Sequence, residues 1–174
     1  MLQWLTFFYK ISWLKASPKD APLSHLAQYL AIVSYWLLGV IILSVSQSFL
    51  AACFLSAVQT GLLVFFANIS LWIRKTPERI TQTITALTGT GAFIAVVSLP
   101  FVFTMSQGAT EASILFNIIW LVLVIWETIV IAHIFRNAMD IHIVAAAGMA
   151  MVFLYLSAAI TFRLMRVIAY TATS

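Results

Sequence analysis

Long apolar stretches separated by short polar segments dominate the chain. A helix that crosses a hydrocarbon core of about 30 Å needs about 20 mainly apolar residues. Stretches of this length occur at residues 26–45, 49–73, 83–105, 112–135 and 143–162. Only Ser46, Gln47 and Ser48 separate the first two, so we expect a tight antiparallel hairpin there. The pattern predicts an all-α fold, a polytopic membrane bundle of five transmembrane helices.

The first 22 residues have a different pattern. At helical spacing Phe8 and Ile11 fall on an apolar side, whereas Lys10 falls on a polar side. Such a segment is typical of an interfacial amphipathic helix, although a frayed tail is an alternative. We therefore divide the chain into residues 1–22, an interfacial helix with a linker, and residues 23–174, the bundle. The residues expected at the membrane interface are Trp4, Phe8, Lys10, Trp13 and Lys15.

Composition supports a membrane protein and excludes several other classes. Only 8% of the residues are charged, whereas soluble domains carry about a quarter. This excludes soluble enzymes and nucleic-acid binders, and the single cysteine, Cys53, excludes an internal disulfide. The expected partners are the lipid bilayer and other membrane protein subunits, and no nucleic acid.

The positions of lysine and arginine predict the orientation, because these residues gather in cytoplasmic segments. With a cytoplasmic N-terminus, seven of the nine basic residues lie inside, and only Arg163 and Arg166 lie outside. We therefore predict a cytoplasmic N-terminus and an external C-terminus. A re-entrant fifth span that returns the tail to the inside is the alternative.

Small and polar residues inside the spans indicate where helices pack. Membrane helices associate through close packing and interhelical hydrogen bonds. Residues 83–105 contain a Gly-Thr-Gly segment, and residues 143–162 contain runs of alanine. We expect these two spans at the centre of the bundle. The polar and packing residues expected inside the membrane are Thr88, Gly89, Thr90, Gly91, Asn68 and Glu127.

Glu127 is the one carboxylate deep within a predicted span. An acidic residue there costs about 2.5–3.5 kcal/mol, so it should face protein or water and have a partner. Helix geometry places Thr90 at a similar depth, which predicts a hydrogen bond from Glu127 to Thr90 or Thr88. This bond would make Glu127 structural, and the alternative is a residue that carries a proton or binds an ion.

The three histidines, His25, His133 and His142, lie at the inner ends of predicted spans. Facing histidines can hold a haem or a metal, but imidazoles also suit the membrane boundary, and no pair has ligand spacing on one helix. We therefore predict no cofactor and no metal site, and keep these histidines as candidates for haem or quinone association. The chain has no recognisable catalytic constellation, so we expect no enzyme.

The second half resembles small bacterial membrane proteins grouped with the Yip (Ypt/Rab-interacting) family. The resemblance rests on Leu87 to Phe93, Ser98 to Phe101, Ile119 to Val124 and His133 to Ala138, and it covers about residues 80–160. It implies five helices and a cytoplasmic N-terminus and, for bacterial members, only a membrane protein of undefined role. The location that we expect is the bacterial inner membrane. Eukaryotic members contact small GTPases through an acidic N-terminal region that this chain lacks.

The sequence favours a non-catalytic integral membrane protein, an accessory subunit of a larger assembly or a membrane-organising protein. Its polar loops are too short to form a soluble active site. One alternative is a proton- or ion-coupled transporter or channel component that uses Glu127. The other is a redox accessory subunit that uses His25, His133 and His142.

Overall fold

The computed structural model describes residues 2–14, 17–18, 21, 24–106 and 113–173. The described chain forms helices α1 (Leu2–Ser12), α2 (His25–Leu43), α3 (Phe49–Ile73), α4 (Ile80–Ser106), α5 (Ser113–Met139) and α6 (Ile143–Thr173), with one 3-10 turn, η2 (Pro77–Arg79). The predicted all-α bundle is confirmed.

Helices α2 to α6 are each long and apolar enough to cross a membrane, which makes this a multi-pass membrane protein. Helices α5 and α6 extend furthest beyond the predicted spans. Helix α5 continues past residue 135 to Met139, because Arg136 points outward and does not interrupt the helix. Helix α6 continues past residue 162 through Arg163 and Arg166, so the re-entrant alternative is wrong. Arg166 instead lies over the ring of Phe162, 4.5 Å from its centroid.

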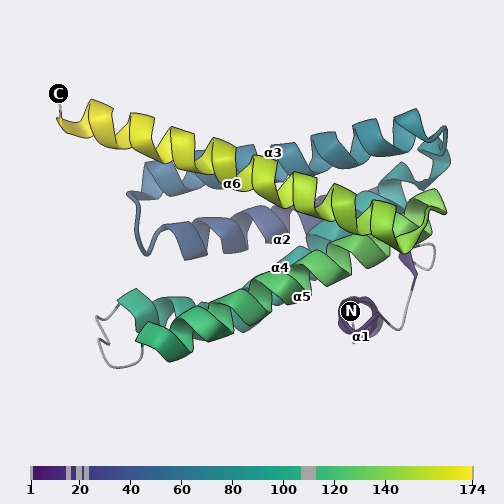
Figure 1. Ribbon diagram of the computed structural model, residues 1–174, viewed down its shortest axis with the longest axis horizontal. Helices are drawn as coiled ribbons and strands as arrows, with labels where there is room; N and C mark the ends of the chain where they lie inside the picture. Colours follow the sequence, from purple (N-terminus) through teal and green to yellow (C-terminus); the bar gives the residue numbers. More distant parts are fainter. Residues whose placement is uncertain (1, 15–16, 19–20, 22–23, 107–112, 174) are drawn as a thin grey trace.

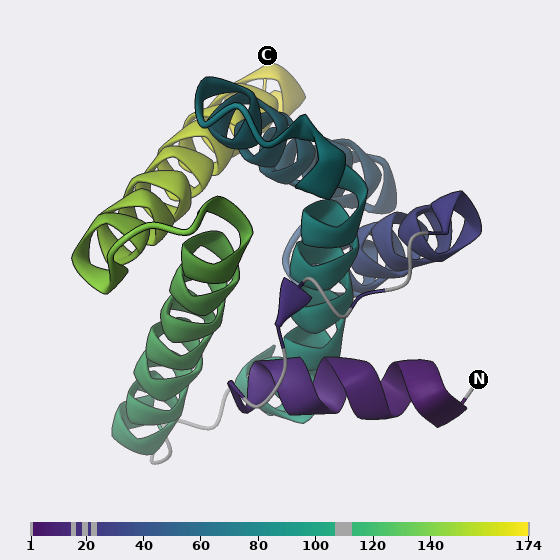
Figure 2. The same cartoon turned by 90° about the vertical axis from the view of Figure 1, so that its right-hand side faces the viewer.

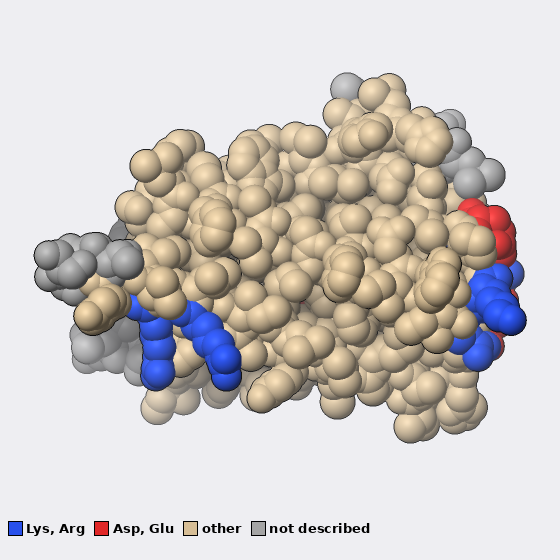
Figure 3. Space-filling model, turned by 90° about the horizontal axis from the view of Figure 1, so that it is seen from above, with Lys and Arg blue, Asp and Glu red and all other residues tan. Residues whose placement is uncertain are grey.

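The five long helices alternate in direction, and the two ends of the bundle differ (Figure 1). The Arg79 end holds the α3–α4 and α5–α6 linkers, with Arg74, Lys75 and Arg79. The hairpin end holds residues 44–48 and the last turns of α6. On the face shown in Figure 3, charged side chains gather at these two ends, and the surface between them is uncharged. This distribution suits a bundle whose middle lies in lipid.

Helix α4 occupies the centre of the bundle. It packs against α1, α2, α3 and α5, and half of its apolar window is buried. Helix α6 packs mainly against α3 and α5, and only 17% of its window is buried. The prediction of a central position was therefore right for residues 83–105 and wrong for residues 143–162. Ala146 and Ala150 of α6 are buried, but larger neighbours such as Val144, Met151 and Tyr155 are exposed.

The buried threonines of α4 satisfy their hydroxyls within the helix. Thr83, Thr85, Thr88 and Thr90 each donate to the carbonyl one turn earlier, at 2.6–2.7 Å. Hydrocarbon offers no water to replace these bonds. Helix α4 can therefore bury these four threonines at the centre of the bundle, because each hydroxyl donates to a backbone carbonyl.

Arg79 joins two linkers at the Arg79 end. Its Nη1 donates to the carbonyl of Ala138 at 2.9 Å and to Oδ2 of Asp140 at 2.6 Å. Ala138 lies in the last turn of α5, where carbonyl groups lack helical partners and a cation is favoured. The contact fixes the start of α4 to the end of α5.

We expect Arg79→Ala to lower the free energy of unfolding by about 1–2 kcal/mol, because two hydrogen bonds from a charged group are lost. Asp140→Asn should lower it by less than about 1 kcal/mol, because that partner is exposed and the bond to Ala138 remains. Thermal unfolding in detergent measures both. Equal losses would show that the bond to Ala138 contributes nothing.

Helix α1 runs across the long axis of the bundle and not along it (Figures 1 and 2). This direction agrees with a helix in the membrane plane, but part of its apolar side packs on protein. Ile11 is fully buried, and Phe8 lies against Gly89 of α4. The carbonyl of Ser12, at the C-terminal end of α1, accepts a hydrogen bond from Trp126 Nε1 at 2.9 Å.

This packing places α1 beside the first half of α4. Gly89 lies nine residues after Ile80, which corresponds to about 14 Å along α4. The interfacial position of residues 1–22 stays a prediction. The structure adds that α1 also contacts protein, through Phe8 at Gly89 of α4 and through the hydrogen bond from Trp126 to Ser12.

Candidate functional site

A central cavity of about 360 Å³ lies between the five long helices, and each of them contributes to its wall. Most of the lining side chains are aliphatic or aromatic. The polar ones are Tyr35 from α2, Ser56 and Gln59 from α3, Ser98 from α4, Glu127 from α5 and Ser157 from α6. Among the described residues that line the cavity, Glu127 is the only one that can carry a charge near neutral pH, because none is Lys, Arg or His.

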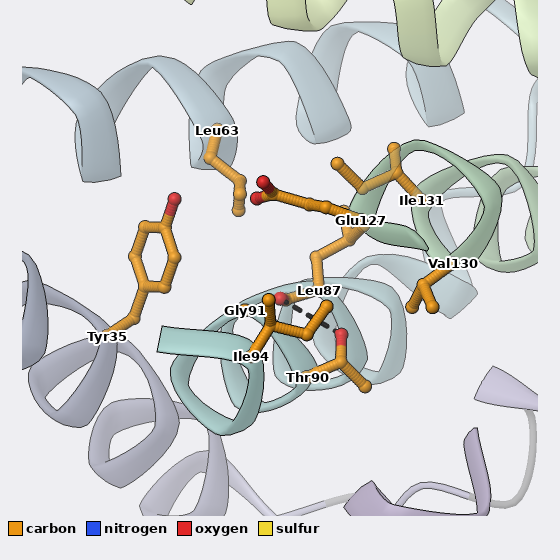
Figure 4. A pocket seen from close by; sticks show the side chains of 9 residues that line it. All are labelled: Tyr35, Leu63, Leu87, Thr90, Gly91, Ile94, Glu127, Val130 and Ile131. Carbon is orange, nitrogen blue, oxygen red and sulfur yellow. Dashed lines mark hydrogen bonds between the residues drawn. The ribbon is translucent and has the colours of Figure 1, made fainter. Parts of the chain in front are cut away.

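The side chains of Glu127 and Tyr35 extend toward one another from opposite sides of the bundle (Figure 4). Within the described chain, no fully enclosed side-chain oxygen or nitrogen lacks a hydrogen-bond partner. No hydrogen bond joins Glu127 to another described residue, so its carboxylate oxygens border open space. The carboxylate therefore belongs to the cavity and not to the packed core.

Toward the Arg79 end, the space beside Glu127 closes. A pocket of about 10 Å³ remains there, close to the smallest space that holds one water molecule. Its aliphatic wall consists of Leu63, Leu87, Ile94, Val130 and Ile131, and Tyr35, Thr90 and Gly91 complete it around Glu127 (Figure 4). Four of these five aliphatic residues lie on the Arg79 side of the carboxylate along their helices.

Toward the hairpin end, the central cavity adjoins a second hollow of about 600 Å³. The two spaces share Ile42, Leu43 and Trp120 in their walls. The second hollow also touches Ser46 in the α2–α3 linker and Asn117 near the start of α5. The second hollow therefore lies next to the central cavity on the hairpin side of Glu127.

The two glycines of the Gly-Thr-Gly segment accept aromatic side chains, not the backbone of another helix. A Cβ on Gly91 would lie 2.6 Å from Cε2 of Tyr35, so the ring reaches the site only because Gly91 has no side chain. Gly89 receives the ring of Phe8 in the same way. The glycines therefore allow close packing, but aromatic rings take the place of the helix backbone that was predicted to approach them.

The predicted hydrogen bond between Glu127 and Thr90 or Thr88 is not formed. Thr90 lines the same small pocket as Glu127, so the expected proximity is correct. Its hydroxyl donates to the carbonyl of Ala86 at 2.6 Å and lies 3.2 Å from that of Leu87, and Thr88 donates to Ile84. The helix backbone competes successfully for these hydroxyl protons.

The other polar residues singled out in the sequence lie apart from the cavity wall. Asn68 donates to the carbonyl of Val64 in its own helix at 2.7 Å and makes no interhelical bond. His25 is exposed in the first turn of α2. Nε2 of His133 lies 3.1 Å from Nδ2 of Asn137 in the same helix. Nδ1 of His142 accepts a hydrogen bond from the backbone N–H of Val144. Among the described residues, no three His, Cys, Asp or Glu side chains form a metal-binding group. Haem or quinone association through the histidines stays an untested alternative.

The expected membrane-interface residues divide into three groups. Lys10 and Trp13 are exposed, and the ring centroid of Trp13 lies 6.3 Å from that of Trp126. Phe8 packs on Gly89 and is half-buried. Lys15 and the side chain of Trp4 lie outside the described residues.

Tyr35, Gln59 and Trp120 belong to the site but were not among the residues expected there. Tyr35 could have been found by the depth argument used for Thr90, since it lies in the middle part of α2. Gln59 lines the cavity and also forms an interhelical hydrogen bond, in which its Nε2 donates to Oγ1 of Thr161 in α6 at 3.1 Å. Nothing in the sequence distinguishes Trp120 from the other tryptophans.

Comparison with protein-family models, with curated proteins and with solved structures finds no match. The resemblance to the Yip family therefore stays a prediction. The class of protein rests on the fold and the cavity: a multi-pass helical membrane protein with a carboxylate in a cavity between its five spans.

Proposed function

We propose that this protein is a proton- or ion-coupled transport component in which Glu127 is the ion-binding group. The observation that carries the proposal is the position of Glu127 in a cavity that leads toward the hairpin end. Intramembrane carboxylates are expensive and commonly mark ion pathways. A purely structural glutamate would be expected to bond to a neighbouring side chain, whereas this carboxylate borders open space.

The asymmetry of the site supports transport over static packing. One side of Glu127 faces a large space, and the other faces a mainly aliphatic wall around a water-sized pocket. A carrier that exposes its binding group to one side at a time needs such an open side and such a closed side. Rearrangement of Leu63, Leu87, Val130 and Ile131 would then open the route to the Arg79 end.

Flux through reconstituted vesicles tests the proposal. We expect wild-type protein to pass protons or monovalent cations down an imposed gradient, and Glu127→Gln to reduce the rate at least about tenfold, because the amide keeps the size of the side chain but cannot bind a cation or release a proton. Glu78→Gln makes the same chemical change at an exposed site in the α3–α4 linker and should leave the rate unchanged.

Thermal unfolding of each variant in detergent shows whether the fold is retained. Equal flux in wild type and Glu127→Gln, or no flux in wild type, would overturn the proposal. The non-catalytic accessory subunit favoured by the sequence would then be the better hypothesis.

A further inference from the structure

We infer that the central cavity binds a monovalent organic cation with an apolar body, such as an amine or a quaternary ammonium compound. The inference rests on the proposed function and specifies its ligand. The cationic group would lie between Glu127 and Tyr35, and the apolar body would lie against Trp120 and Phe153.

The charge of the wall determines the sign of the ligand. Glu127 is the acidic residue among those that line the cavity, and no basic residue accompanies it. A single carboxylate in an apolar surrounding is stabilised by one positive charge and repels an anion. The cavity therefore selects a ligand with one positive charge.

The size of the cavity favours an organic cation over a bare metal ion. A volume of about 360 Å³ falls in the range of about 300–1,000 Å³ that is typical of small-molecule sites. A hard inorganic cation needs about six oxygen ligands in close contact. Glu127 supplies the single carboxylate, and the remaining polar side chains are distributed over the other four long helices that surround the space.

Aromatic side chains line the cavity on three different helices. They are Tyr35 of α2, Trp120 of α5 and Phe153 of α6. Aromatic faces attract ammonium groups through the ring quadrupole, most strongly when water is excluded. Gly91 lets the Tyr35 ring lie against the α4 backbone, which leaves its hydroxyl extending toward Glu127 (Figure 4).

Trp120 lies where the central cavity and the second hollow meet. Trp120 is half-exposed, and it lines both spaces, so a ligand that passes from the second hollow into the central cavity would meet it. Trp120 is therefore positioned to contact the ligand on entry as well as in the bound state.

Equilibrium dialysis of the full chain in zwitterionic nanodiscs tests the inference. The probes are benzyltrimethylammonium and neopentylbenzene, which have nearly the same shape but differ in charge. After correction for partition into empty nanodiscs, we expect wild type to bind the cation at least about tenfold more tightly. Glu127→Gln should remove most of this preference and leave the neutral probe unaffected.

Trp120→Leu should weaken binding of both probes about three- to tenfold, because an aromatic contact with the phenyl ring of the probe is lost. Trp72→Leu is the matched control, because Trp72 is 74% exposed on α3 and lies outside the central cavity. Tyr35→Phe offers a second variant that keeps the ring and removes the hydroxyl, and it should weaken binding less than Glu127→Gln does.

The outcomes separate the ligand from the proposed function. Equal binding of both probes, or unchanged cation binding in Glu127→Gln, would overturn the inference. If neither probe binds while vesicle flux still depends on Glu127, the inference is wrong and the proposed function stands. If flux does not depend on Glu127 but the cation binds through it, the binding site stands and the transport function is wrong.

Discussion

Replacing Gly89 with leucine is expected to displace α1 from the bundle and to lower the free energy of unfolding by about 2–3 kcal/mol, in the range found when a packed core is overfilled. A Cβ at this position would overlap the ring of Phe8, and a leucine adds three further carbon atoms. The ring cannot move inward, because α1 already lies against α4 and its Ile11 is fully buried. The whole helix must therefore shift.

Gly148→Leu is the matched control for this substitution. Gly148 also lies within a long helix, but a Cβ at this position would meet no atom of another helix within 4 Å. Hydrogen exchange of the α1 amides and thermal unfolding in detergent measure the two effects. Retained protection of α1 in Gly89→Leu, with an unfolding temperature equal to that of Gly148→Leu, would contradict the packing described for α1.

The sequence was sufficient to predict the five long helices because the bilayer imposes their length and composition. The ends of these helices were less predictable. Arg136 was expected to end its span, but a charged residue near a helix terminus can point outward while the helix continues. Arg163 and Arg166 likewise lie within α6 and do not end it. Their long side chains can extend along the helix surface to the membrane interface.

The candidate site was predicted only in part. Glu127 could be identified because a carboxylate is rare in a span, and Thr90 could be placed near it by depth alone. The cavity itself could not be predicted, because it depends on the rotation of five helices about their axes. The pairs Gly91–Tyr35 and Gly89–Phe8 also join segments far apart in the sequence, and periodicity along one helix does not identify its partner.

The second substitution expected to lower stability strongly is at Phe135, where α3, α5 and α6 pack together. This residue is 1% exposed, and its ring meets Phe66 edge-on with centroids 5.8 Å apart. The ring of Phe66 in turn lies 5.5 Å from that of Phe153. The three rings join the three helices.

We expect Phe135→Ala to lower the free energy of unfolding by about 2 kcal/mol. When membrane helices separate, their side chains enter lipid and not water, so the transfer term that dominates in soluble proteins is largely absent. The cavity term remains, at about 24 cal/mol per Å³ for a vacated volume of roughly 100 Å³. Unfolding of the protein in mixed micelles by added SDS measures the loss.

Phe65→Ala is the matched control, because it removes a phenylalanine ring without leaving a cavity inside the bundle. Phe65 is adjacent to Phe66 on α3 but is 63% exposed, so its ring faces lipid and its removal leaves no internal cavity. We expect its loss to change stability by less than about 0.5 kcal/mol, as at other surface positions. If the two variants were equally destabilised, transfer into lipid and not close packing would dominate the stability of this bundle. The aromatic contacts between α3, α5 and α6 would then be a consequence of the fold and not a cause of it.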